Sequence, residues 1–227
     1  MDNILKEGIE ALRQYDKDID SLLAHRYEEF ILLLEKYIAE IELFNPAYGL
    51  VGVSNKRELI IKHILDSLAP LGVIFRLLKN KDRDEIADAG SGAGLPGIPL
   101  AIAMPQYNFT LIERMGRRTG FLWNTKAVVN LSNIAIEEGD VEKTKPGHFE
   151  LVTFRAFKPL EPKLLKALFR ACANGGCLAA YKGRLEKIAA EMAPLEKFCS
   201  FWEAVPCPVP FLDEERHLLV IKPLEPA

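Results

Sequence analysis

The first 45 residues carry apolar side chains at three- and four-residue steps, a spacing that predicts helix throughout this region. The pattern is most regular between Leu23 and Ile41, where charged side chains occupy the remaining faces. Residues 44–49 contain proline and glycine and predict the end of that helix. A second helix is predicted over residues 56–71, where leucine and isoleucine form one apolar stripe. The N-terminal part of the chain is therefore predicted to be helical.

Beyond residue 84, short apolar runs alternate with helix-length segments, which predicts a parallel sheet covered by helices on both faces. The predicted strands lie at residues 85–89, 109–113, 133–137, 150–155 and 177–182. After Gly183 a helix is predicted near residues 184–196, followed by strands at residues 198–205 and 217–222. These two strands are joined by a loop without a helix, so they should pair antiparallel. We predict an α/β fold with N-terminal helices and a mostly parallel sheet that ends in an antiparallel C-terminal strand pair.

A glycine-rich stretch follows the first predicted strand. Asp88 ends that strand, and Gly90, Gly92 and Gly94 follow at alternating positions before an apolar helical segment begins. Glycine admits positive φ and lets a ligand approach the backbone closely, and the helix that follows offers free N–H groups at its N-terminus. Two ligand classes fit this loop. Residues 92–97 match the G-x-G-x-x-G pattern of dinucleotide sites, and the same stretch matches the acidic-x-G-x-G-x-G pattern of S-adenosylmethionine sites.

Charge favours S-adenosylmethionine as the ligand of this loop. A dinucleotide would bring an anionic pyrophosphate beside Asp88, whereas S-adenosylmethionine brings an ammonium and a sulfonium that a carboxylate attracts. Glu113 ends the second predicted strand about twenty residues beyond Gly90, where an acid can hold the ribose hydroxyls of either ligand. The antiparallel strand pair is typical of the methyltransferase sheet and is absent from the all-parallel dinucleotide sheet. Together these features predict the Rossmann-like fold of class I S-adenosylmethionine-dependent methyltransferases.

The chain has 227 residues, of which 49% are hydrophobic, which suits one large domain with an appendage or two small domains and is enough to bury a core. We predict an N-terminal helical region at residues 1–83, packed on a methyltransferase domain at residues 84–227. The net charge is −3, so no overall basic field indicates a nucleic-acid partner, and any RNA contact must be local.

Local basic residues are the candidates for such a contact. The predicted phosphate ligands are Lys56, Arg57, Arg117, Arg118 and Lys182. His63 shares a helix face with Asp66 and is a further candidate for RNA contact. The alternative for the lysines and arginines is an ordinary solvated surface, and for His63 and Asp66 it is packing against the sheet.

The chain contains four cysteines without C-x-x-C spacing and four scattered histidines. This pattern predicts neither a metal site nor a disulfide framework, and Cys207, in the far loop, is assigned no chemistry. The N-terminus lacks the apolar core of a secretory signal. The longest nearly apolar run, residues 95–104, is too short to span a bilayer. We therefore expect a cytoplasmic protein without a membrane partner.

Several segments resemble the motifs of one family. They are residues 62–67 (KHILDS), 88–101 (DAGSGAGLPGIPLA), 109–113 (FTLIE) with 116–118 (GRR), 155–157 (RAF) and 215–222 (ERHLLVIK). Over residues 26–222 the chain resembles the small-subunit ribosomal RNA methyltransferase family RsmG, also called GidB. The resemblance implies methylation of guanine nitrogen-7 in the 530 loop of 16S rRNA by a cytoplasmic enzyme that uses S-adenosylmethionine. The implied partner is 16S rRNA or the small ribosomal subunit.

The resemblance also implies a cofactor site. By motif position it places the cofactor against Gly90, Leu95, Glu113, Val141, Glu142 and Arg155. The loop pattern and the end of the third predicted strand complete the predicted set with Asp88, Gly92, Gly94 and Asp140. Two positions depart from the family pattern. Its usual Asn-Leu-Thr reads Asn45-Pro46-Ala47 here, and its usual aspartate at the second strand is Glu113, which changes the reach of the carboxylate.

Methyl transfer to guanine nitrogen-7 requires alignment rather than a base, because that nitrogen has a lone pair and no proton to lose. The sequence accordingly offers no evident general base. Arg155 is the candidate for positioning, because it ends a strand where open α/β sheets bind ligands. A salt bridge to Glu150 or to a loop acid is the alternative for Arg155. Two other functions remain open, an NAD-dependent oxidoreductase and a nucleoside-binding module without turnover.

Overall fold

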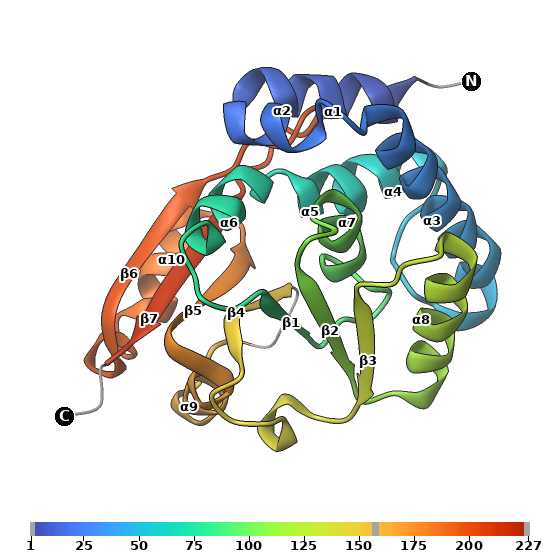
Figure 1. Ribbon diagram of the computed structural model, residues 1–227. Helices are drawn as coiled ribbons and strands as arrows, with labels where there is room; N and C mark the ends of the chain where they lie inside the picture. Colours follow the sequence, from blue (N-terminus) through green and yellow to red (C-terminus); the bar gives the residue numbers. More distant parts are fainter. Residues whose placement is uncertain (1–2, 156–158, 225–227) are drawn as a thin grey trace.

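The computed structural model describes residues 3–155 and 159–224, so Ala156 and Phe157 of the RAF motif lie outside the described residues. Within this part of the chain one sheet of seven strands has the order β3-β2-β1-β4-β5-β7-β6 (Figure 1). The strands are β1 (Glu85–Ala89), β2 (Asn108–Glu113), β3 (Ile134–Glu138), β4 (Phe149–Arg155), β5 (Cys172–Lys182), β6 (Cys199–Pro206) and β7 (His217–Pro223). Strands β1 to β5 pair in parallel, and β7 pairs antiparallel with both β5 and β6. The predicted α/β sheet with its antiparallel C-terminal pair is confirmed.

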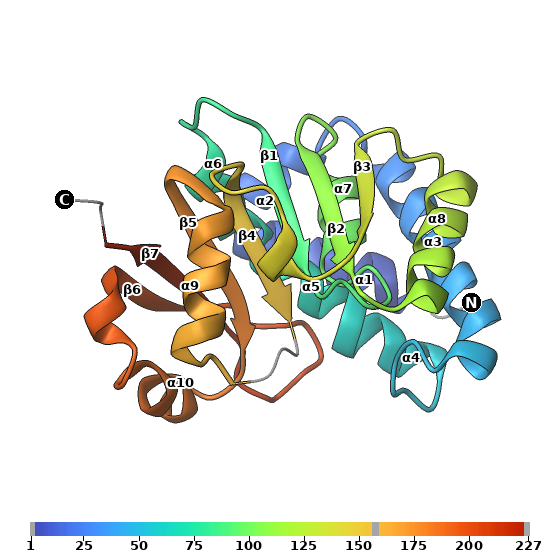
Figure 2. The same cartoon turned by 90° about the horizontal axis from the view of Figure 1, so that it is seen from below.

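Helices cover both faces of this sheet (Figure 2). The longer ones are α1 (Ile4–Tyr15), α2 (Lys17–Leu23), α3 (Tyr27–Tyr48), α6 (Leu71–Leu78), α7 (Gly97–Ala103), α8 (Gly116–Val129), α9 (Pro162–Ala171) and α10 (Leu185–Met192). The N-terminal helices, α7 and α8 share one apolar core with the sheet, and α9 and α10 form a second core on its other face. The division of the chain at residue 84 stays a prediction, although the N-terminal helices and the sheet bury their apolar side chains together.

The N-terminal helical prediction is right in kind and wrong in its boundaries. Asp16 has an extended backbone and its side chain accepts the N–H of Asp18, so α1 ends there and α2 begins. Helix α3 does not stop before Pro46 but continues to Tyr48, where Gly49 at φ 59° ends it. A proline in the last turn of a helix removes only one N–H donor, and a left-handed glycine commonly follows the end of a helix. The sequence therefore located the end of this helix within residues 44–49 but did not identify its last residue.

The helix predicted at residues 56–71 ends at Leu68 and is not a regular α-helix throughout. It consists of α4 (Lys56–Leu59), a π-helical turn η1 (Ile60–Leu65) and α5 (Asp66–Leu68), after which α6 runs separately. A π-helical turn inserts one residue into the helix and so rotates the side chains that follow, and such turns are frequent at functional sites. Both His63 and Asp66 lie in or beside this turn.

Strand β5 begins at Cys172, five residues before the predicted start. Phe149 of β4 pairs with Cys172 and Leu151 pairs with Cys177, so the register shifts between them. A Cβ on Gly176 would lie 2.9 Å from the carbonyl oxygen of Phe149, which leaves room only for glycine. The glycines that permit this bulge also interrupt the apolar run by which a strand is recognised in the sequence, so the first part of β5 was not predicted.

The carboxyl ends of β1 and β4 lie next to each other in the centre of the sheet. From β1 the chain passes through α7 to β2, on one side, and from β4 it passes through α9 to β5, on the other. Connections that leave in opposite directions open a crevice at this edge, which is where open α/β sheets bind ligands.

Candidate functional site

The glycine loop after β1 is held from beneath by Asp88. One carboxylate oxygen of Asp88 accepts the Ser91 hydroxyl at 2.6 Å and the Gly97 N–H at 2.9 Å. The side chain is fully buried, and its other oxygen has no hydrogen-bond partner among the described residues. Asp88 therefore braces the loop and the start of α7 from beneath, and its interaction with a cofactor stays a prediction.

Burial sets the protonation of this carboxyl. It raises the pKa of Asp88 to about 6, against the opposing effects of the hydrogen bonds from Ser91 and Gly97 and of the nearby Arg155 cation. Near neutral pH the group is therefore charged but close to its titration range.

The loop itself has the backbone that its glycines predict. Gly90, Gly92 and Gly94 have φ values of 71°, 60° and 88°. A Cβ on Gly94 would lie 2.4 Å from the Ile98 side chain, so this position excludes any other residue. On the outside of the loop the Tyr37 hydroxyl donates to the carbonyl oxygen of Ala93, a contact from α3 that the sequence did not reveal.

Glu113 ends β2, and its carboxylate connects the glycine loop after β1 to the segment that follows β2. One carboxylate oxygen accepts the Gly92 N–H and the other accepts the Met115 N–H, both at 2.9 Å. Arg118 lies 3.9 Å away, and the Glu113 side chain is only 4% exposed. Glu113 is therefore fixed in position while it faces the crevice.

A cavity of about 480 Å³ opens above these two strand ends. Six of the residues predicted to contact the cofactor line it, and they are Gly90, Glu113, Asp140, Val141, Glu142 and Arg155. Gly92, Gly94 and Leu95 belong to the loop but do not line the cavity. Val141 is buried at the start of a 3₁₀ turn, η2 (Val141–Lys143), and the Asp140 side chain caps that turn. At this end of the cavity the apolar side chain of Val141 therefore lies beside the acidic side chain of Asp140.

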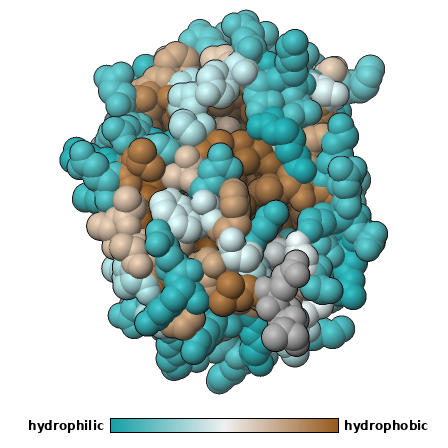
Figure 3. Space-filling model, turned by 90° about the vertical axis from the view of Figure 1, so that its left-hand side faces the viewer, coloured by the Kyte–Doolittle hydropathy of each residue, from teal (hydrophilic) through white to brown (hydrophobic). Residues whose placement is uncertain are grey.

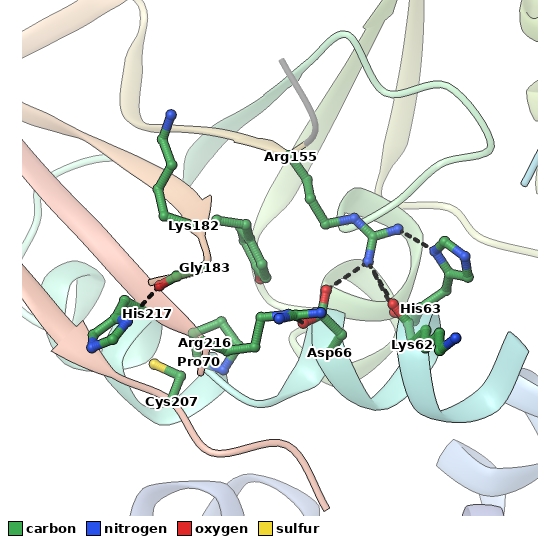
Figure 4. Close-up of a pocket in the computed structure, with 11 residues that line it drawn as sticks. Lys62, His63, Asp66, Pro70, Arg155, Lys182, Gly183, Cys207, Arg216 and His217 are labelled. Atoms are coloured by element: carbon green, nitrogen blue, oxygen red, sulfur yellow. Dashed lines mark hydrogen bonds and ion pairs between the residues drawn. The ribbon is translucent and has the colours of Figure 1, made fainter. Parts of the chain in front are cut away.

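Arg155 stands at the end of β4 in a cluster that Figure 4 shows. One of its terminal nitrogens donates to Asp66 at 2.9 Å, and the other donates to Nδ1 of His63 at 2.9 Å. The second oxygen of Asp66 accepts from Arg216 Nε at 2.9 Å. The alternative expected from the sequence is a salt bridge of Arg155 to Glu150 or to a loop acid. Arg155 does form a salt bridge, but its partner is Asp66, which lies at the start of helix α5.

The contact with Arg155 also fixes the state of His63. A guanidinium can only donate, so Nδ1 of His63 accepts and the imidazole is neutral. Burial is the main cause that lowers the pKa of His63 to about 4, and the Arg155 and Lys62 cations lower it further. The side chain predicted to contact RNA is thus committed to an internal hydrogen bond.

A second cavity of about 260 Å³ lies on the other side of Arg155. Asp66, Lys182, Gly183 and Arg216 are among the residues that line it. Arg155 is common to the two cavities.

Most of the predicted phosphate ligands make internal contacts. Lys56 pairs with Glu42 and Lys182 with Glu191, while the Arg117 guanidinium donates to the carbonyl oxygen of Tyr48. Exposed pairs such as that of Lys56 contribute at most about 1 kcal/mol, so they would not prevent contact with a phosphate. The RNA contacts of Lys56, Arg57, Arg117, Arg118 and Lys182 stay predictions.

Some classes of site are absent from the described residues. They contain no group of three or more histidine, cysteine, aspartate or glutamate side chains that could hold a metal ion. The four cysteines are free, and burial raises the pKa of Cys207 to about 11, so its thiol is protonated at neutral pH. Among the described helices, none combines the length and apolar composition that crossing a membrane requires.

Comparison with known proteins gives concordant results. Residues 31–219 match a family model described as GidB, rRNA small subunit methyltransferase G. The ribosomal RNA small subunit methyltransferase G of Treponema denticola is 38% identical over 216 residues, covering 84% of this chain and 85% of that protein. The structure of precorrin-6y C5,15-methyltransferase from Geobacter metallireducens is 15% identical with a TM-score of 0.54, covering 68% of this chain and 87% of the other. A SAM-dependent methyltransferase from Aquifex aeolicus is 14% identical with a TM-score of 0.52, covering 69% and 92%.

The two structural likenesses confirm the methyltransferase fold, and the family match confirms the resemblance seen in the sequence. The hypothesis of an NAD-dependent oxidoreductase finds no support in these matches. The matched relative bears the name of an enzyme, which favours turnover over a purely binding module.

Proposed function

The chain belongs to the rRNA small subunit methyltransferase G family, and we propose that it transfers a methyl group from S-adenosylmethionine to nitrogen-7 of a guanine in 16S rRNA. The proposed target is one guanine of the 530 loop, and the proposed partner is the small ribosomal subunit in the cytoplasm. The observation that carries the proposal is the meeting of two cavities at Arg155, one suited to a nucleoside and the other flanked by cations.

The larger cavity fits S-adenosylmethionine. Glu113 faces it with a carboxylate whose remaining lone pairs can accept ribose hydroxyls. Val141 offers an apolar surface for the adenine, and Asp140 offers an acceptor for its amine. One buried oxygen of the Asp88 carboxylate has no hydrogen-bond partner among the described residues, and the positive charges of this cofactor would stabilise it. These residues would hold the group, and no other chemistry is required of them.

The reaction requires orientation more than proton transfer. When bound, S-adenosylmethionine would supply an electrophilic methyl group for guanine nitrogen-7, and the electron pair of the carbon–sulfur bond would remain with sulfur. Because nitrogen-7 carries no proton, the chain has to align the base and exclude water rather than accept a proton. Arg155, a donor that borders both cavities, is suited to guanine O6, a contact that leaves the lone pair of nitrogen-7 free to react.

A direct test uses small ribosomal subunits from a strain that lacks this protein. Incubation with methyl-labelled S-adenosylmethionine should place one methyl group on each 16S rRNA molecule. Cleavage of the RNA chain at 7-methylguanine by reduction and aniline treatment should map the label to a single position in the 530 loop. Label at an exocyclic amine or a ribose, or no incorporation into subunits or free 16S rRNA, would contradict the proposal.

Replacing Glu113 by glutamine should weaken cofactor binding by about 10- to 100-fold, because an amide cannot accept from two backbone N–H groups and the ribose at once. Calorimetric titration with S-adenosylmethionine measures the effect. Glu138→Gln is the matched control, since Glu138 ends the next strand but bonds to Thr119 and does not line the cavity. Equal affinities of the two variants would count against the assignment of Glu113.

Cofactor affinity should fall as the pH decreases through about 6, the pKa to which burial raises Asp88. The sign follows from charge: the cationic cofactor prefers the ionised carboxyl, so protonation below that pKa weakens binding and higher pH leaves it constant. Equilibrium dialysis from about pH 5 to about pH 8 measures the dependence. Asp88→Asn should bind more weakly and lose the pH dependence, whereas a flat wild-type profile would show that Asp88 does not interact with the cofactor.

A further inference from the structure

The smaller cavity has the size and position of an acceptor subsite. Its volume of about 260 Å³ equals that of about nine water molecules, enough for one nucleobase removed from its stack. It adjoins the larger cavity at Arg155, so a base within it would lie beside the proposed cofactor site. Lys62, Lys182 and Arg216 line it as well, which suits an RNA chain that carries phosphates.

Asp66 holds both arginines of this cavity. Its two oxygens accept from Arg155 and Arg216, each at 2.9 Å, and Figure 4 shows the carboxylate between the two guanidinium groups. Its side chain is 8% exposed, so neither bond is a loose surface contact. The π-helical turn contributes to the same arrangement, because Arg155 also lies 3.4 Å from the carbonyl oxygen of His63. Three separate parts of the chain thus meet at one carboxylate.

The charge of Asp66 matters for methyl transfer in particular. Before the reaction the positive charge is on the methyl donor, and afterwards it is on the guanine ring, so positive charge develops in the acceptor subsite. Unpaired guanidinium groups would oppose that development at short range. Asp66 neutralises part of their charge while it leaves Nε of Arg155 without a partner among the described residues, free to donate to the O6 of a guanine.

We propose that the smaller cavity is the subsite for the acceptor guanine and that Asp66 is the positioning residue that fixes Arg155 and Arg216 around it. This inference rests on the proposed methyl transfer to rRNA. It assigns to the helix that contains residues 56–68 an indirect part in the reaction, through the two arginines that Asp66 holds.

Asp66→Asn tests the inference with steady-state and single-turnover assays on unmethylated small subunits. The variant should lose about 100-fold in kcat, because the two guanidinium groups lose both their alignment and their counter-charge. KM for subunits should rise by no more than about threefold, because phosphate attraction is not reduced by removing an anion. Cofactor affinity should match wild type, since Asp66 does not line the larger cavity. Asp66→Glu should restore part of kcat.

Glu214→Gln is the matched control. Glu214 bonds to the same Arg216 from the solvent side, with a side chain that is 63% exposed, and its loss should leave kcat unchanged. If wild-type protein methylates subunits and Asp66→Asn does so at the wild-type rate, the subsite assignment is wrong and the proposed function stands. If wild-type protein methylates neither subunits nor free RNA, the proposed function itself fails.

A second variant covers the case in which Asp66→Asn does not fold. Gly183 lines the smaller cavity, and within the described part of the chain a Cβ there would meet only one atom within 4 Å, the Glu215 carbonyl oxygen at 3.8 Å. Gly183→Phe should therefore fold, partly fill the subsite and reduce methyl transfer about 100-fold while it retains cofactor affinity. Gly120→Phe is its control, because Gly120 is exposed on α8 and a Cβ there would meet no atom of the described residues within 4 Å. Wild-type turnover by Gly183→Phe would overturn the proposal.

Discussion

Arg155→Ala should fold, bind S-adenosylmethionine and fail to methylate small ribosomal subunits, with a loss of at least about 1,000-fold in single-turnover rate. Arg155 borders both cavities and makes hydrogen bonds to Asp66 and His63, so its loss removes the donor that the two cavities share. The cost in stability is smaller. Asp66 keeps its bond to Arg216, and we expect a loss of about 2 kcal/mol, which lowers Tm by about 4–8 °C.

Two companion variants make this result specific. Arg155→Lys keeps the charge but cannot contact Asp66 and His63 at once, so it should remain at least about tenfold impaired. Arg13→Ala removes an equally paired arginine that bonds to Glu10 and Asp20 and lines neither cavity, and it should methylate normally. Wild-type turnover by Arg155→Ala would exclude Arg155 from the reaction, whatever its structural contacts.

Gly97→Ala should destabilise the protein by about 3 kcal/mol and lower its Tm by about 6–12 °C, although it adds a single methyl group. A Cβ at this position would lie 2.4 Å from the Leu111 side chain and 2.6 Å from the Asp88 carboxylate. Both neighbours are buried in the sheet, so neither can move aside without disturbing packing. The same shift would break the bond from the Gly97 N–H to Asp88 that holds the loop.

Gly120→Ala is the matched control in thermal denaturation. Gly120 is also helical, but a Cβ there would meet none of the described atoms within 4 Å, so alanine should leave Tm unchanged or raise it through its better helix propensity. Cofactor titration of Gly97→Ala at low temperature should show weakened binding, since the loop it distorts contains Gly90 of the larger cavity. A Gly97→Ala protein with wild-type Tm and affinity would show that the close contact at α7 relaxes without cost.

The sequence predicted the elements of the fold because those depend on local pattern. Apolar runs of strand length, separated by helix-length segments, fix β1 to β5, and the missing helix between the last two strands fixes their antiparallel pairing. The sequence-based prediction of element boundaries failed where the same residue type is compatible with two local conformations. Pro46 was compatible with the end of a helix and with its last turn, and the glycines at the start of β5 concealed a bulge.

By itself the sequence also determined the glycine loop and six of the residues that line the larger cavity, because the carboxyl ends of parallel strands meet wherever they occur along the chain. Only the tertiary structure decided the partners of the charged groups. Asp66 is 89 residues from Arg155 and 150 from Arg216, and no periodicity connects positions so far apart. Hydrogen bonds depend on distances near 3 Å, which packing sets and spacing along a chain does not. For the same reason the sequence did not show that Asp88 lies beneath the loop and accepts hydrogen bonds from Ser91 and Gly97.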